Sequence, residues 1–277
     1  ILCMKPIVAP TDFSPTSLNA VRYAADLAAV LGLRLDLLHV YAIPVPVSEV
    51  PVPFDVERAV ADSQALLDKV KDELSGRTQN RINIRTIVKG GDAISEIADY
   101  CESVKPYMVI MGAETTGVLE RILFGGKTLA AVRHLKWPTL TVPPLVTFKN
   151  IRKIGVACDF KKVTETIRVH EIKELVNEFK AELHVLYVSD EAGGAYDPKT
   201  VEESALFQEM LGNLKPRYHF LKGDDIDAAI TEYAENNNLD MLIIFPKKHN
   251  LAEQVFRHSY SKAVVLHSPV PVMSLHE

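Results

Sequence analysis

The stretch KPIVAPTDF at Lys5–Phe13 returns in altered form as RKIGVACDF at Arg152–Phe160. Both versions are apolar runs that end in Asp-Phe. Three later segments recur in the same order and at one constant separation: VKGGD with LKGDD, YMVIM with DMLII, and WPTLTV with VPVMSL. Self-similarity of this kind indicates that the chain contains two copies of one domain.

The length of the chain agrees with this division. Its 277 residues fit two domains of about 140 residues each, because single domains cluster near ~100–150 residues. A hydrophobic fraction of 47% is enough for two cores, and a charged fraction of 24% is ordinary for globular proteins. We therefore predict domains at residues 4–145 and 150–277, linked by PPLVTFK at Pro143–Lys149.

Short β-rich runs alternate with stretches of helical spacing in each copy. Strands of the first copy are expected at Ile7–Ala9, Leu33–Ala42, Ile82–Val88, Met108–Met111 and Thr139–Val142. Helices are expected at Leu18–Leu31, Ile94–Cys101 and Leu129–Leu135. Ser14 and Pro15 suit the start of the first helix, and Gly32 suits its end. The alternation predicts α/β domains with right-handed βαβ units and mostly parallel sheets.

Composition and charge exclude several classes of protein. The net charge of −5 supplies no basic excess for a nucleic-acid backbone, so we expect no nucleic-acid partner. The three cysteines form no CxxC pair, which favours a reducing compartment over a disulfide framework or a zinc site. The sequence shows neither a membrane-length apolar run nor a signal-peptide pattern, so we expect a cytoplasmic protein without a membrane partner.

Ligands of open parallel sheets bind beyond the carboxyl ends of the strands. Pro10 and Asp12 follow the first strand of the first copy, and an Asp there can accept from a ribose hydroxyl or hold a cation near phosphates. The same Asp can equally serve as a turn or helix-capping residue. Val40 lies at the end of the second strand, where backbone groups can pair with a purine edge. We expect neighbouring His39 to be a core histidine rather than a ligand.

Two glycine-containing loops are further candidates. Gly112 directly follows the buried strand, and GGKT at Gly125–Thr128 opens a helix. Glycines allow a ligand to approach the backbone, and amides at a helix start attract phosphate, although a plain tight turn would use the same residues. GGKT is not part of a P-loop, because Arg121 stands where that motif needs its first glycine. No G-x-G-x-x-G follows the first strand, which argues against a dinucleotide dehydrogenase.

Four segments of the first copy form a joint signature: VAPTDFSPTSLNAVRYAADLA, LLHVY, VKGGDAISEIA and IMGAETTGVLERILFGGKTLAAVRHLKWPTLTV. In this order they resemble a domain of the universal stress protein family, and the second copy resembles it more faintly. The resemblance implies a tandem member of the family. Its two Rossmann-like domains, of the adenine nucleotide alpha hydrolase-like kind, would each have a five-stranded parallel sheet with helices on both faces.

Many members of this family bind ATP through a G-x-x-G-(nine residues)-G-[ST] loop. Gly112 and Gly125 match its first and third glycines, whereas Thr115 replaces the second glycine and Gly126 replaces the Ser/Thr. The resemblance also assigns Asp12 to the acidic position after the first strand and Val40 to the position whose backbone meets adenine. It thus implies that the first domain binds ATP, with Mg²⁺, through Pro10, Asp12, Val40, Gly112, Thr115, Gly125, Gly126 and, by our own inference, Lys127.

The departures from the motif predict weakened binding. The Cβ of Thr115 hinders close approach if that position needs a positive φ, and Gly126 lacks the hydroxyl that would bond a phosphate oxygen. Together with the negative charge of Glu114, these changes are expected to weaken ATP binding by about one to two orders of magnitude. In the second copy the four loop positions hold Phe245, Lys248, His258 and Ser259. Bulky side chains there predict a scaffold or partner-binding copy without a standard ATP site.

The histidines suggest a metal site that the spacing argues against. Four of the nine recur at regular intervals, at His249, His258, His267 and His276. This interval places neighbours on opposite faces of a helix, so we expect surface and loop histidines and no metal. An alternative for part of this region is an anion site built from Lys247, Lys248, His249, Arg257 and His258.

Two features favour self-association. Ile43–Phe54 contains four prolines among valines and is expected to be an extended apolar arm. By the resemblance, the last strands, Thr139–Val142 and Val272–Leu275, lie at sheet edges that join two domains of the family. Unpaired edges invite pairing, so we expect the two copies to pair with each other, or two chains to form a homodimer.

These observations leave three hypotheses. The first is a nucleotide-responsive stress protein without dedicated catalysis. The sequence contains no Ser/His/Asp group, Cys/His pair or HExxH spacing. It also contains no residue that we can name to position water for slow ATP cleavage. The second is a ligand-independent interaction or scaffold module with degenerate nucleotide sites. The third, and the least favoured, is an adenylating α/β enzyme.

Overall fold

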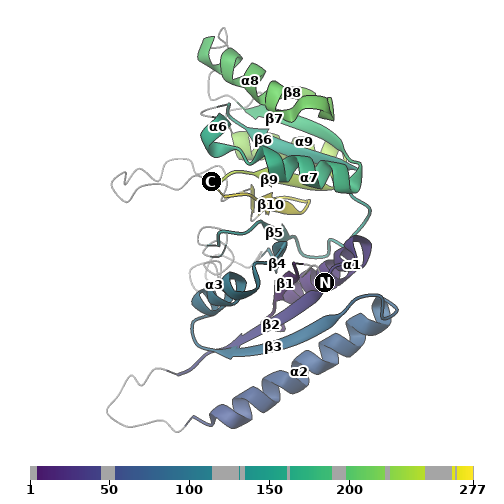
Figure 1. Cartoon of the computed structure of the whole chain (residues 1–277), viewed down its shortest axis with the longest axis vertical. Helices are drawn as coiled ribbons and strands as arrows, with labels where there is room; N and C mark the ends of the chain where they lie inside the picture. The colour runs from purple at the N-terminus through teal and green to yellow at the C-terminus, as the bar shows by residue number, and fades with distance from the viewer. Residues whose placement is uncertain are drawn as a thin grey trace. The chain divides into compact units, whose positions relative to one another are not determined.

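A computed structural model gives the fold of the chain (Figure 1). It describes residues 5–44, 54–113, 131, 135–160, 163–188, 198–221, 225–246, 264–265 and 267–276. Contacts between Cα atoms divide the chain into two compact units, Ile1–Phe148 and Lys149–Glu277. Each unit has a parallel sheet and a buried core of its own.

The first unit is built around five parallel strands. Its elements are β1 (Ile7–Pro10), α1 (Pro15–Leu31), β2 (Leu35–Tyr41), α2 (Val56–Arg77), β3 (Ile84–Gly90), α3 (Ala93–Val104), β4 (Met108–Gly112) and β5 (Thr139–Val142). The strands lie in the order β3-β2-β1-β4-β5, and every adjacent pair runs parallel. Because β4 lies on the other side of β1 from β2 and β3, the sheet has a topological switch point beside β1.

Local signals in the sequence determine where α1 begins and ends. Ser14 caps its start and accepts a hydrogen bond from the amide of Ser17, and Pro15 occupies the first turn. Gly32 ends the helix with a φ of 65°, a left-handed conformation that costs glycine little. The cap, the proline and the terminal glycine expected from the sequence are all confirmed.

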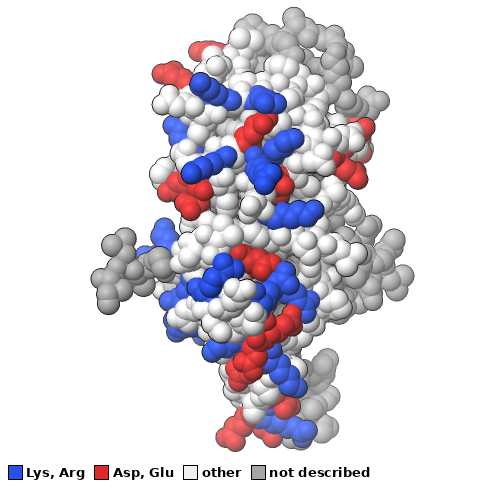
Figure 2. Space-filling model, turned by 90° about the vertical axis from the view of Figure 1, so that its right-hand side faces the viewer, with Lys and Arg blue, Asp and Glu red and all other residues white. Residues whose placement is uncertain are grey.

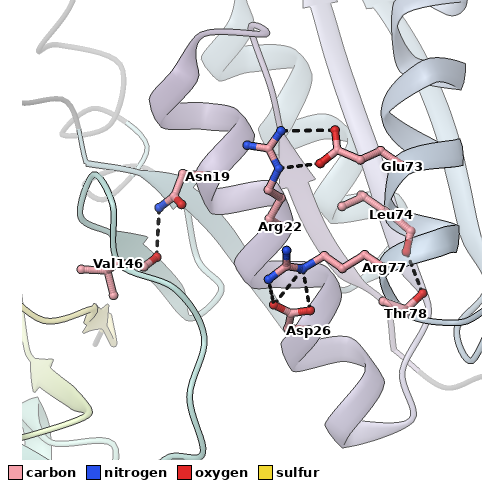
Figure 3. Close-up of polar contacts among 8 residues, drawn as sticks. All are labelled: Asn19, Arg22, Asp26, Glu73, Leu74, Arg77, Thr78 and Val146. Atoms are coloured by element: carbon pink, nitrogen blue, oxygen red, sulfur yellow. Dashed lines mark hydrogen bonds and ion pairs between the residues drawn. The ribbon is translucent and has the colours of Figure 1, made fainter.

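Helix α2 was not anticipated from the sequence. Asp55 caps its N-terminus, but only Ser63, Leu67 and Leu74 are buried along its length, so its pattern is largely polar. The helix packs along β2 and β3 (Figure 1). It is also joined to α1 by two ion pairs, which Figure 3 shows as Arg22 with Glu73 and Arg77 with Asp26.

The ion pairs between α1 and α2 are expected to contribute little to stability. Arg22 Nε lies 2.6 Å from Glu73 Oε1, but 37% and 47% of the two side chains are exposed. Exposed pairs are worth at most about 1 kcal/mol and are screened by salt. A double-mutant cycle of Arg22→Ala and Glu73→Ala should therefore give a coupling below ~1 kcal/mol that shrinks further in ~1 M salt. A coupling of several kcal/mol, or one that salt does not change, would contradict this.

The opposite face of the first sheet carries an apolar cluster. Val8 and Leu38 of the sheet pack there with Ile97 and Cys101 of α3, and the cluster extends to Trp137, the single tryptophan of the chain. Burial raises the pKa of the Cys101 thiol to about 12, so this cysteine acts as an apolar core residue. The predicted helix Leu129–Leu135 belongs to this region, but apart from Ala131 and Leu135 it lies outside the described residues.

The second unit repeats the plan of the first. Its elements are β6 (Lys153–Cys158), α6 (Val163–Thr166), α7 (Val169–Phe179), β7 (Glu182–Val188), α8 (Pro198–Leu211), η1 (Gly212–Leu214), β8 (Arg217–Leu221), α9 (Ile226–Asn236), β9 (Met241–Ile244) and β10 (Val272–Ser274). The strand order β8-β7-β6-β9-β10 matches that of the first unit, again with parallel pairs throughout. The predicted fold class, two Rossmann-like units with parallel sheets, is confirmed. None of the described helices is long and apolar enough to cross a membrane.

Candidate functional site

A cavity of about 90 Å³ opens at the carboxyl ends of the strands in the first unit. It lies at the switch point of the sheet, where β1, β2 and β4 end close together. The N-terminal residues of α1 and α3 form two of its walls. A helix N-terminus carries a partial positive charge, so this position favours groups with negative charge.

Hydroxyl groups line the wall that α1 contributes. Thr11 Oγ1 lies 3.0 Å from Ser17 Oγ and accepts a hydrogen bond from the amide of Phe13. Ser17 Oγ donates in turn to the carbonyl of Ser14, and Thr16 lines the cavity from the same helical turn. These hydroxyls supply both donors and acceptors at one edge of the cavity.

Asp12 combines a local turn contact with a place in the cavity wall. Its Oδ1 accepts a hydrogen bond from the amide of Ser14 at 3.0 Å, so the turn-forming role that the sequence left open is present. Partial burial acts to raise the pKa of Asp12, but hydrogen bonds from Ser14 and Ser17 outweigh it and hold this pKa below its ordinary value. The carboxylate therefore stays ionised through the neutral range.

The opposite side of the cavity is apolar. Leu38 and Val40 of β2, Met111 of β4, and Ile94 and Ile97 of α3 line it. These residues belong to the apolar cluster or pack against it, so this side of the cavity is continuous with the core, and packing fixes its position. Flat ligands with an apolar face bind to surfaces of this kind, which are typical of small-molecule sites.

The structure brings together four of the residues predicted for the site. Pro10, Asp12, Val40 and Gly112 all line the cavity, although they come from three different strand ends. The other four predicted residues, Thr115, Gly125, Gly126 and Lys127, lie outside the described residues. The hydroxyl-bearing residues Thr11, Ser14, Thr16 and Ser17 also line the cavity but were not among the predicted site residues. Their place between the end of a strand and the first turn of the next helix is a signal that could have found them.

Gly112 and His39 each have a structural role as well. A Cβ on Gly112 would lie 2.8 Å from both Cγ2 and the carbonyl oxygen of Thr16, so the absence of a side chain allows α1 to pack closely against β4. His39 Nδ1 lies 2.8 Å from the carbonyl oxygen of Thr11, and its ring packs 4.5 Å from that of Phe13. His39 is therefore half-buried rather than a fully buried core residue, and it has partners within the fold.

The second unit keeps the turn of the first but changes its surroundings. Phe13 and Phe160 both adopt a positive φ, of 64° and 48°, after the Asp that follows the first strand of each unit. The amide of Phe160 donates to Cys158 Sγ at 3.2 Å, just as that of Phe13 donates to a hydroxyl. Phe245 occupies the place of Gly112, and the described residues of this unit instead border a cavity against α8, lined by Phe160, Tyr187, Thr200, Val201, Ser204 and Phe220.

The described histidines correct one expectation from the sequence. His267 is exposed, but His276 is only 5% exposed, and its carbonyl oxygen accepts a hydrogen bond from Arg168. His249 and His258 lie outside the described residues, as do Lys247, Lys248 and Arg257 of the suggested anion site. Among the residues that the structure describes, no group of three or more His, Cys, Asp or Glu side chains could hold a metal ion.

Charges of both signs are mixed on the surface. Figure 2 shows one face of the molecule, on which Lys and Arg side chains lie among Asp and Glu side chains. That face offers no wide basic surface of the kind that a nucleic-acid backbone requires. The expectation of no nucleic-acid partner stays a prediction.

Comparison with known proteins places both units in one family. The family model described as "Universal stress protein family" matches residues 4–143 and again residues 150–276. A universal stress protein of Methanocaldococcus jannaschii is 28% identical over 142 residues, which are 50% of this chain and 81% of that protein. The crystal structure of a universal stress protein from Archaeoglobus fulgidus has a TM-score of 0.73 at 21% identity, and the match covers 99% of this chain and 96% of that one. A protein of unknown function from Pseudomonas aeruginosa has a TM-score of 0.63 at 15% identity, covering 99% and 92%.

Proposed function

The chain belongs to the universal stress protein family, and from this premise we propose that it is a stress-response protein whose first unit binds an adenine nucleotide. One observation carries the proposal. Pro10, Asp12, Val40 and Gly112, which were predicted from the sequence at three separate strand ends, line a single cavity at the switch point of the sheet. Ligands of open α/β sheets bind at this point.

The two sides of the cavity suit the two ends of a nucleoside. The apolar side, with Val40, Ile94 and Met111, offers a surface for a purine ring. The opposite wall offers the ionised carboxylate of Asp12 and the hydroxyl of Ser17, groups that can bond ribose hydroxyls. Phosphates would be attracted by the N-terminus of α1, whose first turn contains no acidic residue. In the proposal Mg²⁺ enters with the phosphates of ATP.

We also propose that this unit binds its ligand without dedicated catalysis. Asp12 is the one ionisable side chain among the described residues that line the cavity. Hydrogen bonds keep the pKa of Asp12 low, so it is a poor proton donor or acceptor near neutral pH. The cavity therefore offers groups that recognise a ligand but none suited to acid-base catalysis, and the response of the protein would come from binding itself.

Titration of the full chain with ATP, with and without Mg²⁺, tests the proposal. Calorimetry should report heat for binding, and ATP should stabilise the first unit against urea because it binds only the folded state. The fluorescence of Trp137 follows that unit specifically, since it is the only tryptophan of the chain and packs against the apolar cluster. No heat, together with unchanged urea unfolding at saturating ATP, would overturn the proposal and favour the interaction-module hypothesis.

Asp12→Asn separates binding from folding. The amide oxygen of Asn can still accept from the Ser14 amide, so the turn should persist while the charge is lost. We expect the affinity for ATP to fall by about tenfold or more, the loss for one hydrogen bond to a charged group. Asp159→Asn, at the matching position of the second unit, is the control and should leave the affinity unchanged. Equal effects of the two substitutions would place the ligand elsewhere.

A further inference from the structure

Each unit contains a polar cluster at the start of its second strand, far along the sheet from the cavity. In the first unit, Arg34 Nε and Nη2 donate to the two carboxylate oxygens of Asp36 at 2.8 and 2.9 Å. The hydroxyl of Tyr100 on α3 donates to Asp36 Oδ2 at 2.8 Å. Asp36 is fully buried, so this pair of opposite charges is fixed in the core.

The second unit has different chemistry in the matching place. His184 on β7 occupies the position that Asp36 occupies on β2. Asp36 pairs with Val8 of β1 and His184 pairs with Gly155 of β6, which hold the same place in the two repeated segments. Glu182 precedes His184 by two residues, as Arg34 precedes Asp36. Tyr233 of α9 reaches His184 as Tyr100 reaches Asp36. A histidine, with an acidic neighbour, has replaced an aspartate with a basic neighbour.

A second histidine completes the cluster. The rings of His184 and His219 lie nearly parallel, with 5.1 Å between their centroids and 12° between their planes. His184 Nδ1 is 3.1 Å from His219 Nε2 and 3.0 Å from the hydroxyl of Tyr233. These contacts join β7, β8 and α9, because each of the three residues comes from a different element.

The surroundings disfavour positive charge on the two rings. Burial is the main factor that lowers the pKa of His184 and of His219, and the positive charge of Arg217 on β8 lowers both further. Lys153 on β6 adds to the effect at His184, and the imidazole of His184 lowers the pKa of His219 further. Glu182 acts in the opposite direction, with Oε1 2.8 Å from His184 Nε2, but the same oxygen also pairs with Arg217 at 2.9 Å.

Geometry sets a limit on how many protons the pair can hold. Facing ring nitrogens 3.1 Å apart can share one hydrogen, with one nitrogen donating and the other accepting. When both imidazoles are protonated, both facing nitrogens carry hydrogens that point at each other, and two positive charges meet in a partly buried place. The hydrogen bond between the rings is then lost, and the rings must separate.

We propose that the His184–His219 pair holds β7, β8 and α9 together only while it is not fully protonated, so that the second unit opens on mild acidification and the first unit does not. The direction follows from linkage. Unfolded imidazoles take up protons below about pH 6.5, whereas the folded ones resist them. The stabilisation is therefore complete above that pH and is lost as the pH falls, until the folded rings are protonated too. The matching place in the first unit holds Asp36 and Arg34 and no imidazole, so that unit lacks the histidine pair on which the opening depends.

Titration of the imidazoles by NMR on the full chain tests the premise. His170 is the reference, because its side chain is 81% exposed. We expect His184 and His219 to remain neutral to lower pH than His170, and to lose their native chemical shifts when they finally take up protons. Titration of both rings together with His170 would overturn the proposal.

Hydrogen exchange on the full chain tests the consequence. Between about pH 7.5 and about pH 5.5, on either side of the ordinary imidazole pKa, opening of peptides from β7, β8 and α9 should increase after correction for intrinsic exchange. The equilibrium constant for opening can change by at most about tenfold per pH unit for each proton taken up. Peptides from β2, β3 and α3 of the first unit should show no comparable change.

Two substitutions separate this pair from the other histidines of the second unit. His184→Asn with His219→Gln should remove most of the pH response, whereas His170→Gln should leave it intact. A full response in the double variant would show that other groups carry it, and no response in the wild-type protein would equally reject the proposal. If the double variant does not fold, the NMR titration of the wild-type protein still decides the matter.

Discussion

Asp36→Asn is expected to destabilise the first unit by roughly 2–4 kcal/mol, as for other buried charges that lose a partner. The carboxylate accepts two hydrogen bonds from Arg34 and one from Tyr100 while fully buried. An amide offers only one acceptor oxygen and turns two hydrogens toward these donors, so Arg34 loses its counter-charge in a half-buried position. Urea unfolding followed by Trp137 fluorescence measures the effect in this unit.

Tyr100→Phe provides a graded comparison. Burial, and then the bond to Asp36, raise the pKa of the Tyr100 hydroxyl above its ordinary value, so it stays a donor. Its removal leaves both bonds from Arg34 in place, and the expected loss is only about 0.5–1.5 kcal/mol, the net worth of one hydrogen bond. Equal losses for the two substitutions, or no loss for Asp36→Asn, would show that the ion pair contributes little to this core.

How far the sequence predicts the fold depends on how local the deciding signal is. Helix α1 could be predicted at both ends, because a cap, a proline and a terminal glycine specify it within one segment. Strand β5 was predicted with its observed bounds, Thr139–Val142. Helix α2 was missed because its segment is largely polar and only three positions along it are buried, so few apolar residues mark its buried face.

The same distinction applies to the candidate site. Parallel topology brings the carboxyl ends of β1, β2 and β4 to one edge, so the grouping of Pro10, Asp12, Val40 and Gly112 could be predicted without coordinates. The hydrogen-bond partners of buried groups could not be predicted in this way. Tyr100 reaches Asp36 only through the register of β2 and the packing of α3, and nothing near either residue in the sequence indicates the pairing.

Gly112 has two explanations, one in ligand binding and one in the packing of a helix against a strand. The alignment selects it as the first glycine of a phosphate loop, and the structure does place it in the cavity wall. The structure adds a reason that involves no ligand, since Thr16 of α1 occupies the space that a Cβ would need. Strand β4 and helix α1 can approach this closely only because position 112 has no side chain.

Gly112→Ala should therefore destabilise the first unit even without a ligand, by about 1–3 kcal/mol, the usual cost of forcing an extra carbon into a packed site. The added Cβ would meet the carbonyl oxygen of Thr16 at 2.8 Å, and a backbone atom in a helix cannot move aside as a flexible side chain does. Gly76→Ala in α2 is the matched control, because a Cβ there would meet no atom within 4 Å. That substitution should instead stabilise the unit by roughly 0.5–1 kcal/mol, as expected for glycine replaced by alanine within a helix. Urea unfolding read by Trp137 compares the two variants, and a Gly112→Ala protein as stable as the wild type would mean that the glycine serves the ligand alone.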